Sequence, residues 1–322
     1  MSEGPFGNVT VTILGDVILD EYLVGRVERL SPEAPVPVLE VQERTRSLGG
    51  AANVARNVVA LGGQARLCGV RGEDDHGEEI LKLCRGLEID SDGVVISSDR
   101  PTTFKQRVIA RTQQIVRIDH ESVEPLGKDV RDRLTAGLRR AMKASDVVVI
   151  SDYDKGVISR EILEVVQREA GGIPIVVDPN VRHFFEYSLA TVVTPNHLQL
   201  ERVSGKRIRG EKELIEAGRS IKKRLSGPAL LVTRGEEGMS LFTGEVEVLK
   251  IPTVAREVYD VTGAGDTVVA ALALGLGSGW DLVEAARTAN VAAGIVVGKR
   301  GTAAVSAREL RERLDELKGG RD

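Results

Sequence analysis

Residues 9–14 read VTVTIL, a short β-branched run, and residues 50–61 read GAANVARNVVAL, a pattern with helical spacing. The same alternation returns along the chain in ARLCGV with GEEILKLC, DVVVI with REILEVVQREA, and the runs PIVVD, TVVTP and ALLVT. Such alternation is typical of βαβ units, whose parallel strands are covered by helices. The sequence therefore predicts an α/β fold with a doubly wound, mostly parallel sheet and helices on both faces.

The domain organisation follows from the regularity of these patterns. Val130, Leu134, Leu138 and Met142 recur every four residues, which indicates an amphipathic helix. No Pro/Ser-rich linker or change of composition divides the 322 residues, of which 42% are hydrophobic and can form a large core. We expect residues 1–322 to form a single domain.

Two stretches interrupt the alternation. Residues 35–46, PVPVLEVQERTR, are extended and proline-rich, and residues 102–119, TTFKQRVIARTQQIVRID, have strand character on both sides of a polar middle. Charges interrupt both stretches, so neither resembles a buried parallel strand. We expect them to form a small inserted β lid over a site, although an edge hairpin without function fits the pattern equally well.

Composition excludes several classes of partner. The net charge is -4 and only 3% of the residues are aromatic, which argues against a nucleic-acid surface. Cys68 and Cys84 form no C-x-x-C pair and are expected to be core thiols in a reducing compartment. The N-terminus lacks a signal pattern, and the apolar run at 268–277 is too short to cross a bilayer. We expect a cytoplasmic protein without nucleic-acid or membrane partners.

The stretch VTGAGDT, residues 261–267, has two glycines around an alanine and an aspartate behind them. A helix is expected to start near Gly265, so the N–H groups from Gly263 to Asp266 would be available to an anion. Asp266 could then take the proton from a hydroxyl that attacks a phosphoryl group. Aspartate is also a common helix cap, and from this stretch alone a cap is the favoured interpretation.

Other candidate ligand-binding residues lie in the first sixty positions. GDVILDEY puts Asp16 and Asp20 at the end of the first expected strand, where ligands gather in parallel sheets. Gly49 and Gly50 precede a helix that carries Asn53 in its first turn. The carboxylates could bind sugar hydroxyls or serve in turns, and the glycines could admit a ligand or only permit a turn.

The two glycine-rich stretches, GGAANVARNVVALG and DVTGAGDT, resemble the two signatures of the ribokinase-like (PfkB) carbohydrate kinases. A closer resemblance, from residue 9 to residue 310, is to the D-glycero-beta-D-manno-heptose 7-phosphate kinases of ADP-heptose synthesis. It rests on ILGDVILDEY, RLSPEAPVPVLEV, FKQRV, RTQQIVRID, SDYDKG, LLVTRGEEGMSL, EVYDVTGAGDT and ANVAAGIVVGKRGT. Because the match covers the whole chain, we expect the chain to lack the adenylyltransferase domain that the bifunctional members carry.

The resemblance implies a ribokinase-like fold and a role for each matching position. It makes Asp266 the catalytic base, with Gly263, Ala264 and Gly265 as its anion hole. The implied sugar pocket consists of Asp16, Asp20, Gly49, Gly50, Asn53 and Asp152. Lys105 and Arg107 match lid cations that meet the sugar phosphate. The implied nucleotide site consists of Asn196, Thr233, Gly238, Gly265 and Asn290, with Asn196 also assigned to magnesium.

Two positions depart from the family pattern. The superfamily usually has Asn-x-x-Glu where this chain reads NHLQ, with Gln199 in place of the glutamate and Glu201 two residues too late. The heptose kinases read Asp-Pro-Lys where this chain has Asn180 in place of the lysine. Both changes bear on metal binding, rate and substrate.

The resemblance implies an ATP-dependent, Mg²⁺-using kinase that phosphorylates the anomeric hydroxyl of D-glycero-β-D-manno-heptose 7-phosphate to the 1,7-bisphosphate. Exposed lid strands also suggest a homodimer formed through the lid. Two alternatives remain, a kinase of this fold for another sugar, and a sugar- or nucleotide-binding protein with weak catalysis, which Gln199 motivates.

Overall fold

The computed structural model describes residues 4–111, 113–244, 247–255, 258–299 and 303–319. Within the motifs quoted above, Thr112, Glu257 and residues 300–302 lie outside the described residues. None of the helices in these ranges is long and apolar enough to span a membrane.

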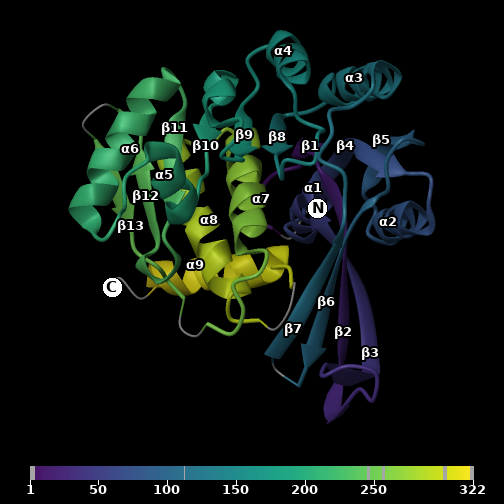
Figure 1. Cartoon of the computed structure of the whole chain (residues 1–322). Helices are drawn as coiled ribbons and strands as arrows, with labels where there is room; N and C mark the ends of the chain where they lie inside the picture. Colours follow the sequence, from purple (N-terminus) through teal and green to yellow (C-terminus); the bar gives the residue numbers. More distant parts are fainter. Residues whose placement is uncertain (1–3, 112, 245–246, 256–257, 300–302, 320–322) are drawn as a thin grey trace.

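A nine-stranded sheet forms the centre of the molecule (Figure 1). Its order is β13 (Val248–Ile251), β12 (Met239–Phe242), β11 (Ala229–Thr233), β10 (Val192–Val193), β9 (Ile175–Asp178), β8 (Val147–Ser151), β1 (Thr10–Gly15), β4 (Gln64–Gly72) and β5 (Asp90–Ser97). The strands from β11 to β5 in this order pair in parallel, whereas β12 and β13 pair antiparallel at one edge. The predicted mostly parallel α/β sheet is confirmed.

Helices cover both faces of this sheet, as predicted. One core contains side chains from α1 (Ala51–Ala60), α2 (Asp75–Gly86), α7 (Ala264–Gly277), α8 (Leu282–Val296) and α9 (Ala307–Gly319). The other contains α3 (Lys128–Met142), α4 (Arg160–Glu169), α5 (His197–Ser204), α6 (Glu211–Leu225) and the short 3₁₀ helix Phe184–Leu189. In β8, Val147 and Val149 face the first core while Val148 and Ile150 face the second, because side chains alternate along a strand. Cys68 and Cys84 are both buried.

A second, four-stranded sheet extends away from the first (Figure 1), and we call it the projecting sheet. Its order is β3 (Pro37–Gly50), β2 (Val17–Leu30), β6 (Thr103–Ala110) and β7 (Gln113–His120). The expectation of a small sheet from residues 35–46 and 102–119 is confirmed, and a simple edge hairpin is not what forms.

Strand β2 was not predicted as a separate element. Its first residues, from Val17 onward, are buried and apolar like those of β1, so the sequence reads as one strand that continues. The chain instead turns at Asp16, and Val17 pairs with Gly50 at the base of the projecting sheet. Asp20 consequently lies in β2, opposite Lys105 of β6, and not at the end of the first strand.

Candidate active site

Helix α7 begins within one residue of the predicted start. Gly263 precedes its first residue, Ala264, with φ of 78°, a left-handed conformation that glycine adopts without strain. No side chain caps this N-terminus, and a Cβ added at Gly265 would meet no other part of the described structure within 4 Å. The start of α7 thus combines the dipole and backbone N–H groups of a helix N-terminus with room beside Gly265, which are the properties of an anion site.

Asp266, the third residue of α7, is buried with 6% of its surface exposed. Its Oδ2 accepts a hydrogen bond from the amide nitrogen of Asn53 at 2.5 Å, and its Oδ1 accepts one from the hydroxyl of Tyr153 at 2.9 Å. Since these bonds lead to other elements and α7 has no side-chain cap bond, the alternative that Asp266 only caps its helix is wrong.

The surroundings of Asp266 shift its ionisation. Burial raises the pKa of Asp266 from 3.8 to about 6, while the hydrogen bonds from Asn53 and Tyr153 and the charge of Arg56 oppose the rise. The negative charge of Asp20 adds to it. A carboxylate with this pKa is ionised at neutral pH and is more basic than an exposed one, which suits a general base.

Helices α1 and α7 are joined behind this carboxylate by a polar contact. The Asn57 amide nitrogen donates to the backbone oxygen of Asn53 at 2.8 Å, and the Thr267 hydroxyl donates to Asn57 Oδ1 at 2.9 Å. Asn53 and Asn57 are 3% and 0% exposed. The contact holds the Asn53 amide in place beside Asp266.

Tyr153 is a site residue that the sequence reasoning missed. It lies in the loop that follows β8, residues 152–159, which we call the β8 loop. Its hydroxyl binds Asp266 and its backbone N–H donates to Asp16 Oδ2 at 2.7 Å. The residue pattern of SDYDKG does not indicate that its tyrosine is functional. The only available signal was that this tyrosine follows the end of a parallel strand, where ligands commonly bind.

Asp16 anchors the β8 loop. Its carboxylate is 1% exposed and accepts backbone N–H groups from Tyr153, Lys155 and Val157 at 2.7, 3.2 and 3.3 Å. Burial, together with the charge of Asp152, raises the pKa of Asp16 to about 6 against the effect of these bonds. Both oxygens accept bonds from the loop, so Asp16 has a structural task, and its sugar contact stays a prediction.

Asp152 is also occupied within the protein. Its Oδ2 accepts from the Tyr187 hydroxyl at 2.6 Å and lies 2.7 Å from Nδ1 of His183, and its Oδ1 accepts from the backbone of Asp154 at 2.8 Å. The hydrogen bond to Asp152 raises the pKa of His183. Asp152 is 5% exposed and supports the β8 loop through the backbone of Asp154, and its sugar contact stays a prediction.

The paired glycines are explained by close packing. A Cβ added at Gly49 would lie 2.4 Å from Asp20 Oδ2, and one added at Gly50 would lie 2.4 Å from the backbone oxygen of Asp16. Gly50 also has φ of 55°. Gly50 is therefore required by its backbone conformation and close packing, and a side chain at Gly49 would have to displace the Asp20 carboxylate, whether or not a ligand also contacts either glycine.

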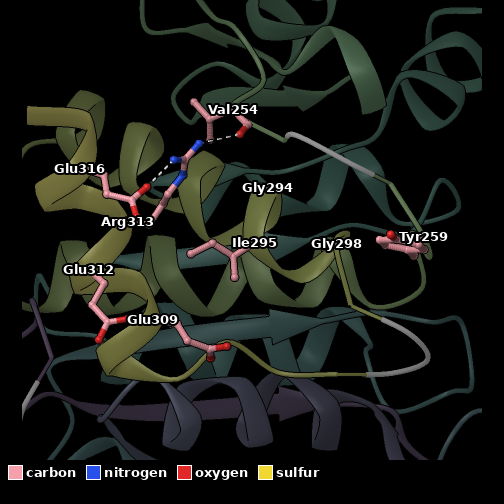
Figure 2. Close-up of a pocket in the computed structure, with 9 residues that line it drawn as sticks. All are labelled: Val254, Tyr259, Gly294, Ile295, Gly298, Glu309, Glu312, Arg313 and Glu316. Atoms are coloured by element: carbon pink, nitrogen blue, oxygen red, sulfur yellow. Dashed lines mark hydrogen bonds and ion pairs between the residues drawn. The ribbon is translucent and has the colours of Figure 1, made fainter. Parts of the chain in front are cut away.

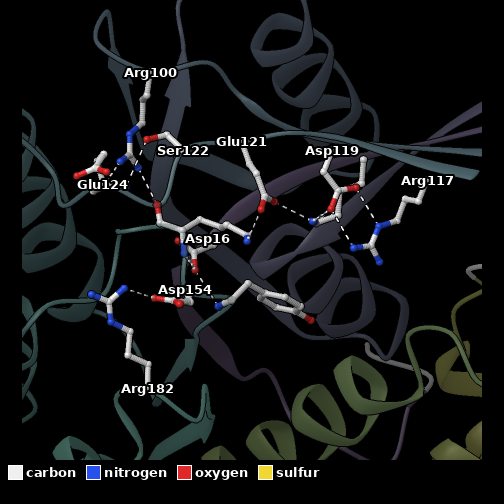
Figure 3. A network of polar contacts seen from close by, with 12 residues as sticks. Asp16, Arg100, Arg117, Asp119, Glu121, Ser122, Glu124, Asp154 and Arg182 are labelled. Atoms are coloured by element: carbon white, nitrogen blue, oxygen red, sulfur yellow. Dashed lines mark hydrogen bonds and ion pairs between the residues drawn. The ribbon is translucent and has the colours of Figure 1, made fainter.

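The two predicted lid cations lie two residues apart on β6 and share a face of the strand. Lys105 forms ion pairs with Asp119 and Glu121, each at 2.9 Å. Arg107 Nη1 is 2.5 Å from Asp20 Oδ1. Each cation thus has a carboxylate partner, and Figure 3 shows Asp119 and Glu121 on this network.

The structure divides the predicted nucleotide residues into two groups. Asn196, which follows β10, forms a parallel bridge with Thr233, the last residue of β11. Gly238 and Asn290 contact the chain after β13. Gly238 has φ of 79° and an added Cβ there would come within 2.1 Å of the last carbonyl oxygen of β13, while Asn290 Nδ2 donates to the backbone oxygen of Pro252 at 2.8 Å. This second pair helps to place the segment that leads into VTGAGDT.

Gln199 takes part in a capping box at the start of α5. Its Oε1 accepts the Asn196 N–H at 2.7 Å, and Asn196 Oδ1 accepts the Gln199 N–H at 2.9 Å. The Gln199 amide nitrogen also donates to the backbone oxygen of Pro179 at 2.9 Å, which a glutamate could not do. Asn180 Oδ1 accepts the Arg182 N–H at 2.9 Å in the adjoining turn. Both departures from the family pattern therefore have local structural partners.

The magnesium assignment gains no support from this geometry. The single side-chain oxygen of Asn196 already accepts the bond that caps α5. Across the described ranges, no three His, Cys, Asp or Glu side chains gather where they could hold a metal ion.

A cavity of ≈ 450 Å³ lies between α8, α9 and the segment before VTGAGDT (Figure 2). It is lined by Val254, Tyr259, Gly294, Ile295, Gly298, Glu309, Glu312, Arg313 and Glu316. Arg313 crosses it, with an ion pair to Glu316 at 2.7 Å and a hydrogen bond to the backbone of Val254 at 3.3 Å. None of the predicted catalytic or sugar-binding residues lines this cavity.

Because the pKa of Asp266 is raised, ionisation of this side chain should lower the free energy of unfolding at neutral pH. A carboxyl whose pKa is higher in the folded state favours folding when protonated, and this contribution is lost as pH rises from about 4 through about 6. Asp266→Asn, which stays neutral, should therefore raise the free energy of unfolding at pH 7 by up to about 3 kcal/mol and change it little at pH 4. Urea denaturation at both values measures this difference.

Asp74→Asn is the matched control. Burial raises the pKa of Asp74, but hydrogen bonds from Thr102 and Gly77 outweigh burial and lower it overall, so its charge stabilises the fold at neutral pH. This variant should lose stability at pH 7 and lose less at low pH. Equal pH dependence in the two variants would contradict the account of Asp266.

Gln199→Glu should destabilise the protein by about 1 kcal/mol, because the carboxylate cannot donate to Pro179. Gln167→Glu, at an exposed position on α4, makes the same chemical change without that partner and should have little effect. Thermal denaturation of both variants measures the difference. A Gln199→Glu protein as stable as the Gln167→Glu control would show that the contact with Pro179 contributes nothing.

Comparison with known proteins identifies relatives of the whole described fold. Residues 10–309 match the pfkB family of carbohydrate kinases. The chain is 47% identical over 300 residues to the bifunctional protein HldE of Trichlorobacter lovleyi, which covers 92% of this chain and 61% of that protein. It is 43% identical over 314 residues to HldE of Shewanella amazonensis, covering 98% and 65%. The chain thus spans less than two thirds of the length of these relatives.

Solved structures share the fold at low sequence identity. Phosphofructokinase-2 from Escherichia coli, solved with substrates and products, has a TM-score of 0.79 and 19% identity, with coverage of 97% of this chain and 100% of that one. Arabidopsis thaliana ribokinase, complexed with ribose and ATP, has a TM-score of 0.75 and 21% identity, with coverage of 96% and 99%. With its nine-stranded sheet, projecting sheet and GAGD turn, the chain belongs to the pfkB family of carbohydrate kinases.

Proposed function

We propose that this chain is an ATP-dependent kinase that phosphorylates the anomeric hydroxyl of D-glycero-β-D-manno-heptose 7-phosphate to give the 1,7-bisphosphate. The product would serve ADP-heptose synthesis for surface glycans such as the lipopolysaccharide core. Support for a heptose comes from the motifs shared with that kinase family and from the 42–47% identity to HldE proteins. A pfkB kinase for another sugar or sugar phosphate is the alternative.

The observation that carries the proposal is the pair formed by Asp266 and the start of α7. In the proposed step, the sugar hydroxyl gives its proton to Asp266 while its oxygen forms a bond to the γ-phosphorus of ATP. The bond from that phosphorus to the bridging oxygen breaks, and ADP leaves with the electron pair. Backbone N–H groups from Gly263 to Asp266 would stabilise the charge on the transferred phosphoryl oxygens, as helix N-termini do.

ATP and magnesium enter the proposal differently. An ATP site near Asn196, Thr233 and Asn290 is supported by the family and by the ribokinase solved with ATP. Magnesium commonly keeps several water ligands and binds through substrate phosphates, with few protein ligands. Because the Asn196 oxygen is used in the α5 cap, we assign no protein ligand to magnesium and no catalytic step to it.

The projecting sheet would act as a lid over the sugar and exclude water from the reaction. Its outer strands, β3 and β7, also present apolar side chains to the surface. Val41 on β3 and Ile115, Val116 and Ile118 on β7 are 40–47% exposed. A homodimer through this sheet is therefore part of the proposal, since unpaired edge strands with apolar side chains are suited to association.

Turnover of Asp266→Asn tests the proposed function. Asparagine keeps the shape and loses the base, so ADP formation should fall by roughly 10²–10⁴ while ATP and sugar binding remain. The assay should compare heptose 7-phosphate, fructose 6-phosphate, ribose and fructose as substrates of the wild type and the variant.

Three results would count against the proposal. Wild-type turnover in the variant would remove Asp266 as the base. A wild type that prefers another sugar would move the assignment to the alternative kinase. A wild type that forms no ADP with any of the four would favour a binding protein with weak catalysis.

A further inference from the structure

Glu121 lies between two lysine side chains. Its Oε2 is 2.9 Å from Lys105 Nζ and its Oε1 is 2.7 Å from Lys155 Nζ. Both lysine side chains are mostly covered, at 12% and 15% exposure, and Glu121 is 24% exposed. The hydrogen bonds from the lysines outweigh the effect of burial and lower the pKa of Glu121, so it is ionised at neutral pH. One carboxylate therefore bridges two ammonium groups.

The two lysines come from separate parts of the fold that both adjoin the candidate active site. Lys105 lies on β6 of the projecting sheet, and Lys155 lies in the β8 loop. The backbone N–H of Lys155 donates to the buried Asp16, which fixes this part of the loop. Two residues earlier, the Tyr153 hydroxyl contacts Asp266. The β8 loop thus supplies one residue that contacts the proposed base and another that belongs to the lysine pair.

The acidic partners of these lysines differ in how firmly they are held. Asp119 lies in β7 and has a second partner, Arg117, at 2.9 Å (Figure 3). Glu121 follows the last residue of β7, in a connection without regular structure, and each of its two oxygens contacts one lysine. Of the two carboxylates, Glu121 can move away more readily, because no strand pairing holds its backbone.

A phosphate monoester is a stronger partner for two ammonium groups than a carboxylate, since it carries more charge and a further acceptor oxygen. Lys155 shares the carboxylate of Glu121 with Lys105. Arg107, by contrast, is held by Asp20 at 2.5 Å and lies 5.2 Å from the ring centre of Tyr22. The observations therefore favour Lys155, and not Arg107, as the partner of Lys105 in binding an anion.

We propose that Lys105 and Lys155 bind the phosphate group that the sugar substrate already carries, and that Glu121 occupies this position until the substrate displaces it. The proposal rests on the proposed function in that it concerns a phosphorylated sugar. It makes Lys155 a specificity-determining residue and Glu121 an internal competitor of the substrate.

Opposite effects of two variants test the proposal. Lys155→Gln should raise KM for heptose 7-phosphate by roughly tenfold to a hundredfold, the loss expected for one charge-assisted contact, with kcat and the KM for ATP little changed. Glu121→Gln removes the competitor and should lower KM for the same substrate. Lys155→Arg keeps the charge and should restore most of the affinity. Lys128→Gln, at an exposed lysine paired with Asp132 on α3, is the control and should change neither constant.

Binding of inorganic phosphate, followed by ³¹P NMR, separates this proposal from the proposed function. If the wild type does not phosphorylate heptose 7-phosphate but Lys155→Gln weakens phosphate binding, the anion site stands and the heptose assignment fails. If the wild type is active on that sugar and Lys155→Gln leaves its KM and phosphate binding unchanged, the anion site is overturned and the function stands. A rise of KM in both Lys155→Gln and Glu121→Gln would also overturn the anion site, because the ion pair between Lys155 and Glu121 would then have only a structural role.

Discussion

The burial of the Asp266 carboxylate between Asn53 and Tyr153 is the contact on which the rest of the site depends. These three residues lie about a hundred or more positions apart in the chain, in α7, α1 and the β8 loop. A buried carboxylate without partners would be strongly unfavourable, so each of the three elements must be placed accurately for the charge to be tolerated. The contacts behind them, through Asn57 and Thr267 on one side and Asp16 on the other, fix those elements.

The burial of Asp266 lowers the stability of the fold and raises the basicity of the carboxylate. A carboxylate whose pKa is raised to about 6 weakens the fold at neutral pH, yet the same shift makes it a better proton acceptor.

The β8 loop is anchored by a second buried carboxylate, Asp16. Asp16 binds its backbone at three positions, so the tyrosine that contacts Asp266 and the lysine that contacts Glu121 are held by one buried anchor.

The sequence was sufficient to predict the main sheet, the helices on both faces and the start of α7, because strand and helix periods are local properties of the chain. It failed at β2, because buried apolar residues follow directly after β1 and hide the turn at Asp16. The motifs also placed Asp266 and Asn53 in one site, and the structure brings them into contact. The bonds of Asp16 to loop backbone and of Asp152 to Tyr187 depend on the tertiary fold, so the sequence spacing could not predict them. Tyr153 was missed for the same reason. The sequence also could not predict that Lys105 pairs with carboxylates, or that Gln199 donates a hydrogen bond to Pro179.

The pH dependence of kcat/KM in the wild type and in Tyr153→Phe tests the central claim most directly, because it reports the ionisation of the base in the free enzyme. The wild-type value should fall as pH drops through about 6, where Asp266 becomes protonated. Since the Tyr153 hydroxyl lowers the pKa of Asp266, Tyr153→Phe should move this fall to higher pH. Asp16 also has a pKa of about 6, but it accepts the backbone N–H of residue 153, which the substitution keeps. A profile that is flat between pH 5 and 8, or one that Tyr153→Phe leaves in place, would contradict the assignment of Asp266 as a buried base held by Tyr153.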